Sequence, residues 1–159
     1  MSEAPIGKNY VWIIPFILAL FILLDGVSFL ILGAGADRSV ILRVTGNSWE
    51  QIVSSLPTVA NYINNLTYIV GLSLVGFGLM IAGASITGYR EGQKWAWLLS
   101  WYLPLYFLVA GVITYREGVN ISLDAFQADF LFFFFGLSIV AQLISFYWFF
   151  PRHKQLEQS

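Results

Sequence analysis

Two long apolar runs joined by a short polar turn constrain this chain more than any other feature. Residues 66–88 and 95–115 are predominantly apolar, and the segment 89–94 between them reads Tyr-Arg-Glu-Gly-Gln-Lys. The hydrocarbon layer of a bilayer is about 30 Å thick and an α-helix rises about 1.5 Å per residue, so about 20 apolar residues span it. Each run is long enough to cross a membrane. The pair predicts a helical hairpin around which the rest of the chain packs.

The composition extends this interpretation to the whole chain. Of the 159 residues, 58% are hydrophobic and 11% are charged, against about 25% charged in an ordinary soluble domain. Four apolar segments, at about 11–33, 59–88, 95–115 and 128–150, take up most of the length. The sequence therefore predicts an all-α membrane protein, with one integral membrane domain over residues 1–159 that forms a four-transmembrane-helix bundle. We expect the first segment to be retained, because no convincing signal-peptide cleavage pattern follows it.

Charge and residue types exclude several classes of function. The net charge is −1, and the eight Lys and Arg residues are scattered, whereas nucleic-acid binding needs a concentrated basic face. Cysteine is absent, which excludes disulfides, iron–sulfur ligands and zinc–thiolate sites. The single histidine, His153, cannot supply the pair of ligands that a bis-histidine haem needs. No cofactor, metal or nucleic acid is expected.

The loop between the first two spans carries a helix signal. Residues 48–51 read Ser-Trp-Glu-Gln, which is the spacing of a capping box with Ser48 as cap and Gln51 reaching back. We expect a short helix over residues 49–55 in this first outer loop. Its expected common apolar side consists of Trp49, Ile52, Val53 and Leu56. Such a helix can lie flat in a bilayer interface, or it can pack over the end of the bundle, and the sequence leaves both open.

Small residues form a stripe on the second span. Gly71, Gly78, Ala82 and Ser85 follow one another at spacings of seven, four and three residues, which places them on one helical face. Such a stripe lets another backbone approach closely, and this matters in lipid because apolar side chains gain little by exchanging one apolar medium for another. We expect a helix packing face within the chain, with self-association as the competing interpretation.

Proline and glycine mark the ends and bends of the later spans. Pro104 lies well inside the third span and predicts a kink there. The tetrapeptide Tyr-Arg-Glu-Gly occurs at 89–92 and again at 115–118. An aromatic anchor, a base in the last turn and a glycine that can adopt a left-handed conformation are typical of a helix C-terminus. We expect both copies to end helices, and Ser122 to cap the fourth span.

The basic residues predict the orientation of the chain. Five bases lie on the side of the termini, namely Lys8, Arg90, Lys94, Arg152 and Lys154, and three lie on the other side, namely Arg38, Arg43 and Arg116. Because cytoplasmic loops carry the excess of Lys and Arg, both termini are expected in the cytoplasm. The predicted location is the cell membrane, with several passes through it.

Asp25 is the only ionisable residue inside the first span. A carboxylate at this depth costs several kcal/mol unless it is neutralised, paired or hydrated, so such residues often mark a proton, ion or ligand site. Two interpretations stand. Asp25 is either a hydrogen-bonded or protonated residue that pins the first helix to the bundle, or a functional carboxylate. One of the arginines Arg38, Arg43 and Arg116 could reach toward it.

Other polar residues within the spans are expected to form interhelical hydrogen bonds of about 0.6 to 2 kcal/mol each. They are Tyr68, Ser73, Tyr102, Tyr106 and Gln142. None of them specifies a reaction. No second membrane acid is present to pair with Asp25 for acid–base catalysis, and no Ser/His/Asp set occurs. An enzyme is therefore the least favoured class of function.

The turn after the second span resembles a known loop. Residues 90–97 read Arg-Glu-Gly-Gln-Lys-Trp-Ala-Trp, which is similar to the base-x-Gly-x-base-Trp-Ala-Trp turn of small uncharacterised four-helix membrane proteins of bacteria and archaea. The resemblance implies the four-helix topology and no activity. The leading functional expectation is a non-catalytic accessory or structural subunit of a larger membrane assembly, with the lipid bilayer and other membrane subunits or further copies as partners. The alternative is a small transporter, channel or ligand-binding bundle that uses Asp25.

Overall fold

The structure is a computed structural model that describes residues 10–116 and 124–150, with backbone alone for 114, 116, 124–130 and 147. Its regular elements within these ranges are all helical, which confirms the predicted all-α class for this part of the chain. They are α1 (Ile13–Leu32), the 3-10 helix η2 (Gly33–Asp37), α2 (Arg38–Thr45), α3 (Trp49–Ser55), α4 (Pro57–Ala84), the π-helical turn η3 (Ser85–Tyr89), α5 (Lys94–Ser100), α6 (Tyr102–Arg116) and α7 (Asp124–Phe149).

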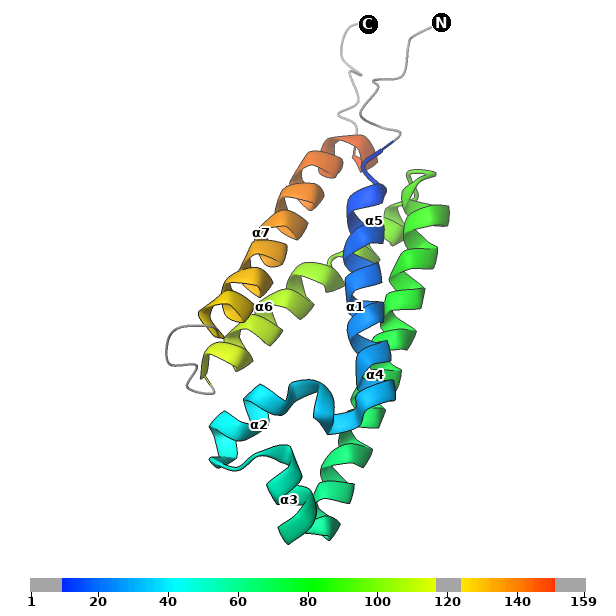
Figure 1. Ribbon diagram of the computed structural model, residues 1–159. Coiled ribbons are helices and arrows are strands. Elements are labelled where there is room, and N and C mark those ends of the chain that lie inside the picture. Colours follow the sequence, from blue (N-terminus) through cyan, green and yellow to red (C-terminus); the bar gives the residue numbers. More distant parts are fainter. Residues whose placement is uncertain (1–9, 117–123, 151–159) are drawn as a thin grey trace, which may run out of the picture.

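Two pairs of helices make up the fold (Figure 1). Helix α1 packs along α4, and α6 packs along α7. The start of α1, the turn after α4 and the end of α7 lie at one end of the molecule, whereas α2 and α3 lie at the other, where the two pairs diverge. The expected hairpin between α4 and the following span is present only near its turn, where α5 packs on α4 and η3, because the main partner of α4 is α1. Helix α4 meets α6 at Phe77, whose ring stacks on Tyr102 at 4.8 Å.

Glycines bring the backbones of α1 and α4 together. A Cβ added to Gly26 of α1 would lie 2.7 Å from the backbone nitrogen of Val75, and one added to Gly71 of α4 would lie 2.9 Å from the carbonyl oxygen of Gly26. Further along α4, a Cβ at Gly78 would lie 2.8 Å from the Cβ of Leu23. Real Cβ atoms do not approach other heavy atoms this closely. The structure thus places two members of the small-residue stripe against α1.

The main core lies where α1, α4, α6 and α7 meet. Its buried side chains are Leu18, Ala19, Ile22, Leu74, Ile81, Ala82, Leu103, Phe107 and Phe134. Ser85, at the end of the stripe, is also buried, and its hydroxyl donates to the carbonyl of Ile81 at 2.7 Å. This local bond satisfies the hydroxyl without a partner on another helix. Close packing of small and large side chains therefore joins these helices.

The third apolar segment is broken at Trp101. Helix α5 ends at Ser100 and α6 begins at Tyr102. Pro104 explains the break, because it has no N–H to bond the carbonyl of Ser100 and its ring crowds that carbonyl. The predicted kink is confirmed, and it takes the form of a one-residue break between two helices.

The first Tyr-Arg-Glu-Gly copy ends a helix as predicted. Tyr89 is the last residue of η3, and Gly92 has a φ of +78°, in the left-handed region that glycine favours. The amide of Gln93 then donates to the carbonyl of Gly88 at 2.8 Å, which closes the turn. Of the second copy, residues 117–118 lie outside the described residues, as does Ser122.

The capping box is confirmed at the start of α3. The amide of Gln51 donates to the hydroxyl of Ser48 at 3.2 Å, and the amide of Ser48 donates to Oε1 of Gln51 at 2.7 Å. Two backbone donors that the helix itself cannot satisfy are thereby paired. Helix α2, in the same loop, was not predicted. It ends at Gly46, whose φ is +69°.

The expected apolar side of α3 is buried only in part. Trp49 and Ile52 are buried in a cluster with Ala34 and Ala60, so this part of α3 packs over the end of the α1–α4 pair. Val53 and Leu56, by contrast, are 44% and 55% exposed. The sequence left open whether this helix lies flat in the bilayer interface or packs over the end of the bundle. The burial of Trp49 and Ile52 supports packing over the bundle.

Three helical segments among the described residues are long and apolar enough to cross a bilayer. They are Ile13–Thr45, Pro57–Tyr89 and Lys94–Ile113. A shorter apolar stretch, Leu131–Phe146, lies within α7. Most of the large apolar side chains on these segments remain exposed, including Ile31 at 72% and Leu72 at 65%. Exposed apolar surface of this extent is typical of helices that face lipid or another subunit.

Candidate functional site

Asp25 borders a cavity of about 320 Å³ between α1, α6 and α7. The cavity is lined by Phe21, Ile22, Leu24, Asp25, Tyr106, Phe107, Leu131 and Phe134. Asp25 supplies the only carboxylate of this lining, and the Tyr106 hydroxyl is the only other polar side-chain group. The site is therefore an apolar, largely aromatic cavity with one acid at its wall.

The packing of α1 on α4 sets the direction of Asp25. Gly26 is buried against α4, and neighbouring residues on an α-helix are rotated by about 100°. Asp25, one residue earlier, is consequently exposed on the side of α1 that borders α6 and α7. Phe21, one turn before Asp25, shares this side, and its ring lies 5.0 Å from the ring of Phe134 on α7.

Tyr106 is the polar partner of Asp25. Its hydroxyl is close enough to the carboxylate to interact with it electrostatically. The Tyr106 ring is held between the ring of Tyr102, at 6.3 Å, and the ring of Phe107, at 5.3 Å. The hydroxyl of Ser28 donates to the backbone carbonyl of Asp25 at 2.7 Å and so engages the main chain rather than the acid.

Arg38, one of the three arginines that could reach toward Asp25, pairs with Glu50 instead. Nη1 of Arg38 lies 3.2 Å from Oε1 of Glu50, and both side chains are exposed. A hydrogen bond from its own backbone amide, with a further contribution from Arg38, lowers the pKa of Glu50. Arg43 is half-buried on α2, and the side chain of Arg116 lies outside the described residues. The polar side chain that the structure places beside Asp25 is that of Tyr106.

The other predicted polar residues lie away from the cavity. Tyr68 is 41% exposed on α4, and Ser73 is exposed and donates to a carbonyl one turn earlier at 2.9 Å. Tyr102 is half-buried beside Tyr106 but does not line the cavity at Asp25. Of the predicted candidates, only Asp25 and Tyr106 line this cavity, and Tyr102 stacks on Tyr106 outside it.

Gln142 belongs to a separate polar network between α5 and α7. Its Nε2 donates to the hydroxyl of Ser100 at 2.5 Å, and Nε1 of Trp97 donates to the hydroxyl of Ser145 at 3.1 Å. The serines of this network were not predicted from the sequence. A signal was present on α7, where Ser138, Gln142 and Ser145 recur at spacings of four and three residues and therefore share a helical face.

No protein-family model, curated protein or solved structure matches this chain. The possible chemistry of the site therefore follows from the side chains that line it. Among the described residues, no group of three His, Cys, Asp or Glu side chains is placed to hold a metal ion. A carboxylate and a phenol at an aromatic cavity can pair with a cationic group and cover its apolar part.

Proposed function

We propose that this chain is an integral membrane protein that crosses the bilayer four times and binds a lipophilic cation in the cavity at Asp25. The observation that carries this proposal is an exposed carboxylate at the wall of a cavity whose only other polar side-chain group is the Tyr106 hydroxyl. At membrane depth such a carboxylate is costly without a counter-charge. A ligand with a positive group and an apolar body offsets that cost and also fills the cavity.

The lining supports an organic cation rather than a bare metal ion. A calcium ion takes six to eight oxygen ligands, and magnesium demands an octahedral set, whereas this cavity offers one carboxylate and one hydroxyl. The rings of Phe21, Tyr106, Phe107 and Phe134 can instead attract a quaternary or protonated amine through their π faces. The volume of about 320 Å³ is that of a site for a small organic molecule.

The proposal is tested with a pair of probes that differ only in charge. Benzyltrimethylammonium carries a permanent positive charge, and neopentylbenzene is its neutral isostere with carbon in place of nitrogen. We expect purified protein in detergent to bind the cation saturably, with one molecule per chain and an affinity at least about tenfold higher than for the neutral probe. Equal, non-saturable uptake of both probes would show partition into apolar surface and would contradict the proposal.

The four crossings make a separate prediction about topology. Ser54 in α3 and Gln93 in the turn after α4 are both exposed, and one crossing, α4, separates them. Because cysteine is absent, Ser54→Cys and Gln93→Cys can each be labelled without background. With cytoplasmic termini, an impermeant thiol reagent added to intact cells should label position 54 and not position 93. The reverse pattern would invert the orientation, and equal labelling of both would contradict the crossing by α4.

The outward face of α4 favours a second candidate function, membership of a larger membrane assembly. Exposed residues recur along α4 and into η3 at alternating spacings of three and four. These residues, the outward seam, are Ile69, Leu72, Gly76, Leu79, Gly83 and Ile86. Alternation of small and large residues with this period is typical of a helix that packs on a further helix.

The second candidate makes its own prediction. A Cβ at Gly83 would have no atom within 4 Å, so Gly83→Leu should leave the fold of the single chain intact. If the outward seam binds another membrane subunit or a second copy, Gly83→Leu should remove that subunit from the complex seen by native mass spectrometry. A complex that survives this substitution unchanged would exclude the outward seam as its interface.

A further inference from the structure

A second cavity lies on α6, next to the cavity at Asp25. It has a volume of about 330 Å³ and is lined by Tyr102, Leu105, Tyr106, Val109, Ala110 and Ile113. All six residues belong to α6, and four of them are aliphatic. Leu105, Val109 and Ile113 are between 48% and 58% exposed. This cavity is therefore an open, mainly apolar groove along one face of the helix, here called the α6 groove.

Tyr106 lines both the Asp25 cavity and the α6 groove. Successive residues of an α-helix are rotated by about 100°. Around α6, Ala110 consequently lies between Phe107, which lines the Asp25 cavity, and Tyr106, one turn earlier. The methyl group of Ala110 is the smallest side chain in the two linings. The way from the Asp25 cavity around the Tyr106 ring into the α6 groove therefore passes over Ala110.

One end of the α6 groove is closed by a contact with α4. The ring of Phe77 stacks on that of Tyr102, the first residue of the groove, at 4.8 Å and with an angle of 23° between the ring planes. Toward the other end of α6, the α1–α4 and α6–α7 pairs diverge (Figure 1). A chain that enters over Ala110 has apolar wall ahead of it as far as Ile113.

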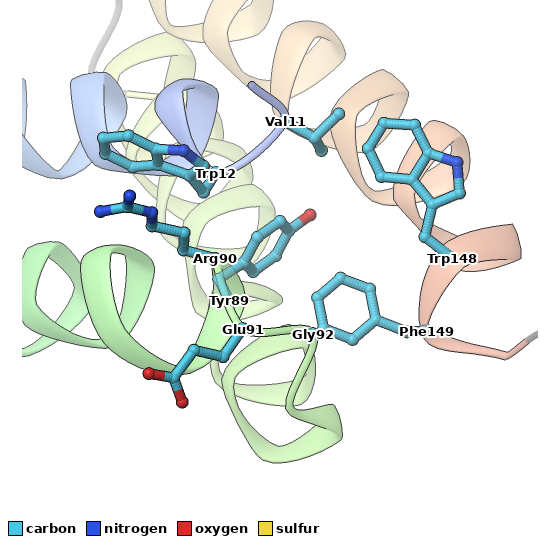
Figure 2. Close-up of a pocket in the computed structure, with 8 residues that line it drawn as sticks. All are labelled: Val11, Trp12, Tyr89, Arg90, Glu91, Gly92, Trp148 and Phe149. Carbon is cyan, nitrogen blue, oxygen red and sulfur yellow. The ribbon is translucent and has the colours of Figure 1, made fainter. Parts of the chain in front are cut away.

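The small cavity at the opposite end of the molecule differs in size and charge. Its volume is about 100 Å³, and it shares no lining residue with the other two. Figure 2 shows the Arg90 side chain at its wall beneath Trp12, with Cζ 5.8 Å from the ring centroid. A guanidinium at the wall disfavours a second cation. Of these three cavities, the one at Asp25 is where a cation and an adjoining apolar groove come together.

We propose that the cation bound at Asp25 is an amphiphile whose apolar tail lies in the α6 groove. This inference rests on the cation site proposed above. The positive head lies against the Asp25 carboxylate, the tail passes over Ala110, and its methylene groups cover Val109 and Ile113. A charged wall that continues into an apolar groove matches a molecule with one charged end. The class of ligand is thereby narrowed to long-chain amines and quaternary ammonium compounds.

Ala110→Leu tests the path of the tail with two cations that share a trimethylammonium head. Benzyltrimethylammonium is compact, and decyltrimethylammonium carries a long flexible tail. Ala110 is half-buried at an open groove, so a larger side chain can extend into the groove without disturbing the helix contacts. A buried methylene group adds about fourfold to an affinity. Exclusion of a few such groups should lower the affinity for decyltrimethylammonium at least about tenfold, with benzyltrimethylammonium changed by less than about twofold.

Val112→Leu is the matched control, because Val112 is 43% exposed on α6 and lines neither cavity. It should bind both cations as the wild type does. Equilibrium dialysis of wild type and variants at one detergent concentration makes uptake by the micelles common to all samples. Decyltrimethylammonium that binds Ala110→Leu and wild type with equal affinity would overturn the inference.

A second measurement uses the wild-type chain alone. Decyltrimethylammonium with a diazirine at the end of its tail should cross-link to Val109 and Ile113, and excess benzyltrimethylammonium should remove these cross-links by displacing the head from Asp25. Cross-links that this competitor does not reduce would overturn the inference in favour of a groove filled by lipid or by another helix. Saturable binding of benzyltrimethylammonium would then leave the proposed function standing. If neither cation bound the wild type, the proposed function would fail and this inference with it.

Discussion

Gly78→Leu is expected to unfold at a clearly lower temperature than the wild-type protein in detergent. Even the first atom of a side chain at Gly78 would lie 2.8 Å from the Cβ of Leu23 and 2.9 Å from its backbone nitrogen. A backbone atom cannot rotate away, so α1 and α4 must move apart along the contact. Overpacking costs about 1–3 kcal/mol where side chains can adjust, and we expect the upper part of that range or more. Thermal unfolding followed by circular dichroism measures the loss.

Gly76→Leu is the matched control for this experiment. Gly76 is two residues away on the same helix, and a Cβ added there would have no atom within 4 Å. Both substitutions bring the same change in helix propensity, so a difference between them isolates the contact with α1. A second control, Leu137→Ile on α7, should have little effect because it conserves volume. Equal unfolding temperatures for the two glycine variants would mean that α1 and α4 do not meet at Gly78.

Asp25→Asn is expected to abolish selectivity for the cation while the protein stays folded. Asparagine has the same shape and keeps an acceptor for the Tyr106 hydroxyl, but it carries no charge and cannot titrate. Affinity for benzyltrimethylammonium should fall at least about tenfold, to that for neopentylbenzene. In the wild type, the affinity for the cation should fall on acidification, because only the ionised carboxylate attracts it. The affinity of the variant should be independent of pH over the same range.

Ser28→Ala is the matched control, because it removes a polar group near Asp25 that should not contribute to cation binding. The Ser28 hydroxyl bonds the backbone carbonyl of Asp25, so its loss should leave cation affinity and its pH dependence unchanged. An Asp25→Asn protein that binds the cation as tightly as the wild type would remove the functional interpretation. Asp25 would then be a structural residue that joins α1 to α6 through Tyr106.

Helix ends were predictable from the sequence because local chemistry sets them. Ser48 and Gln51 cap each other across a single turn, and Gly92 adopts a left-handed conformation within its own turn. Pro104 breaks the helix at a carbonyl four residues earlier. The partner of α4 was not predictable in the same way. Small residues indicate that some backbone approaches closely, but they carry no information on which helix it is.

The candidate site was predictable only in part, because the sequence shows which residues are polar but not which helices bring them together. Asp25 is distinguished by its charge within an apolar run, and Tyr106 is one of several polar residues within the spans. Their meeting depends on the rotation of α1, which Gly26 fixes through its contact with α4. Arg38 was expected to be available to Asp25, but the unpredicted helix α2 carries it to Glu50 on the neighbouring helix.

The position of a bound cation tests the proposed site most directly. A benzyltrimethylammonium probe that carries a diazirine can be irradiated on the folded protein, and the modified residues can be mapped by mass spectrometry. We predict cross-links to the cavity wall, at Phe21, Leu24, Phe107 and Leu131, that disappear with excess unlabelled benzyltrimethylammonium and in Asp25→Asn. Cross-links on the outward seam of α4 that neither the competitor nor the substitution reduces would contradict cation binding at Asp25.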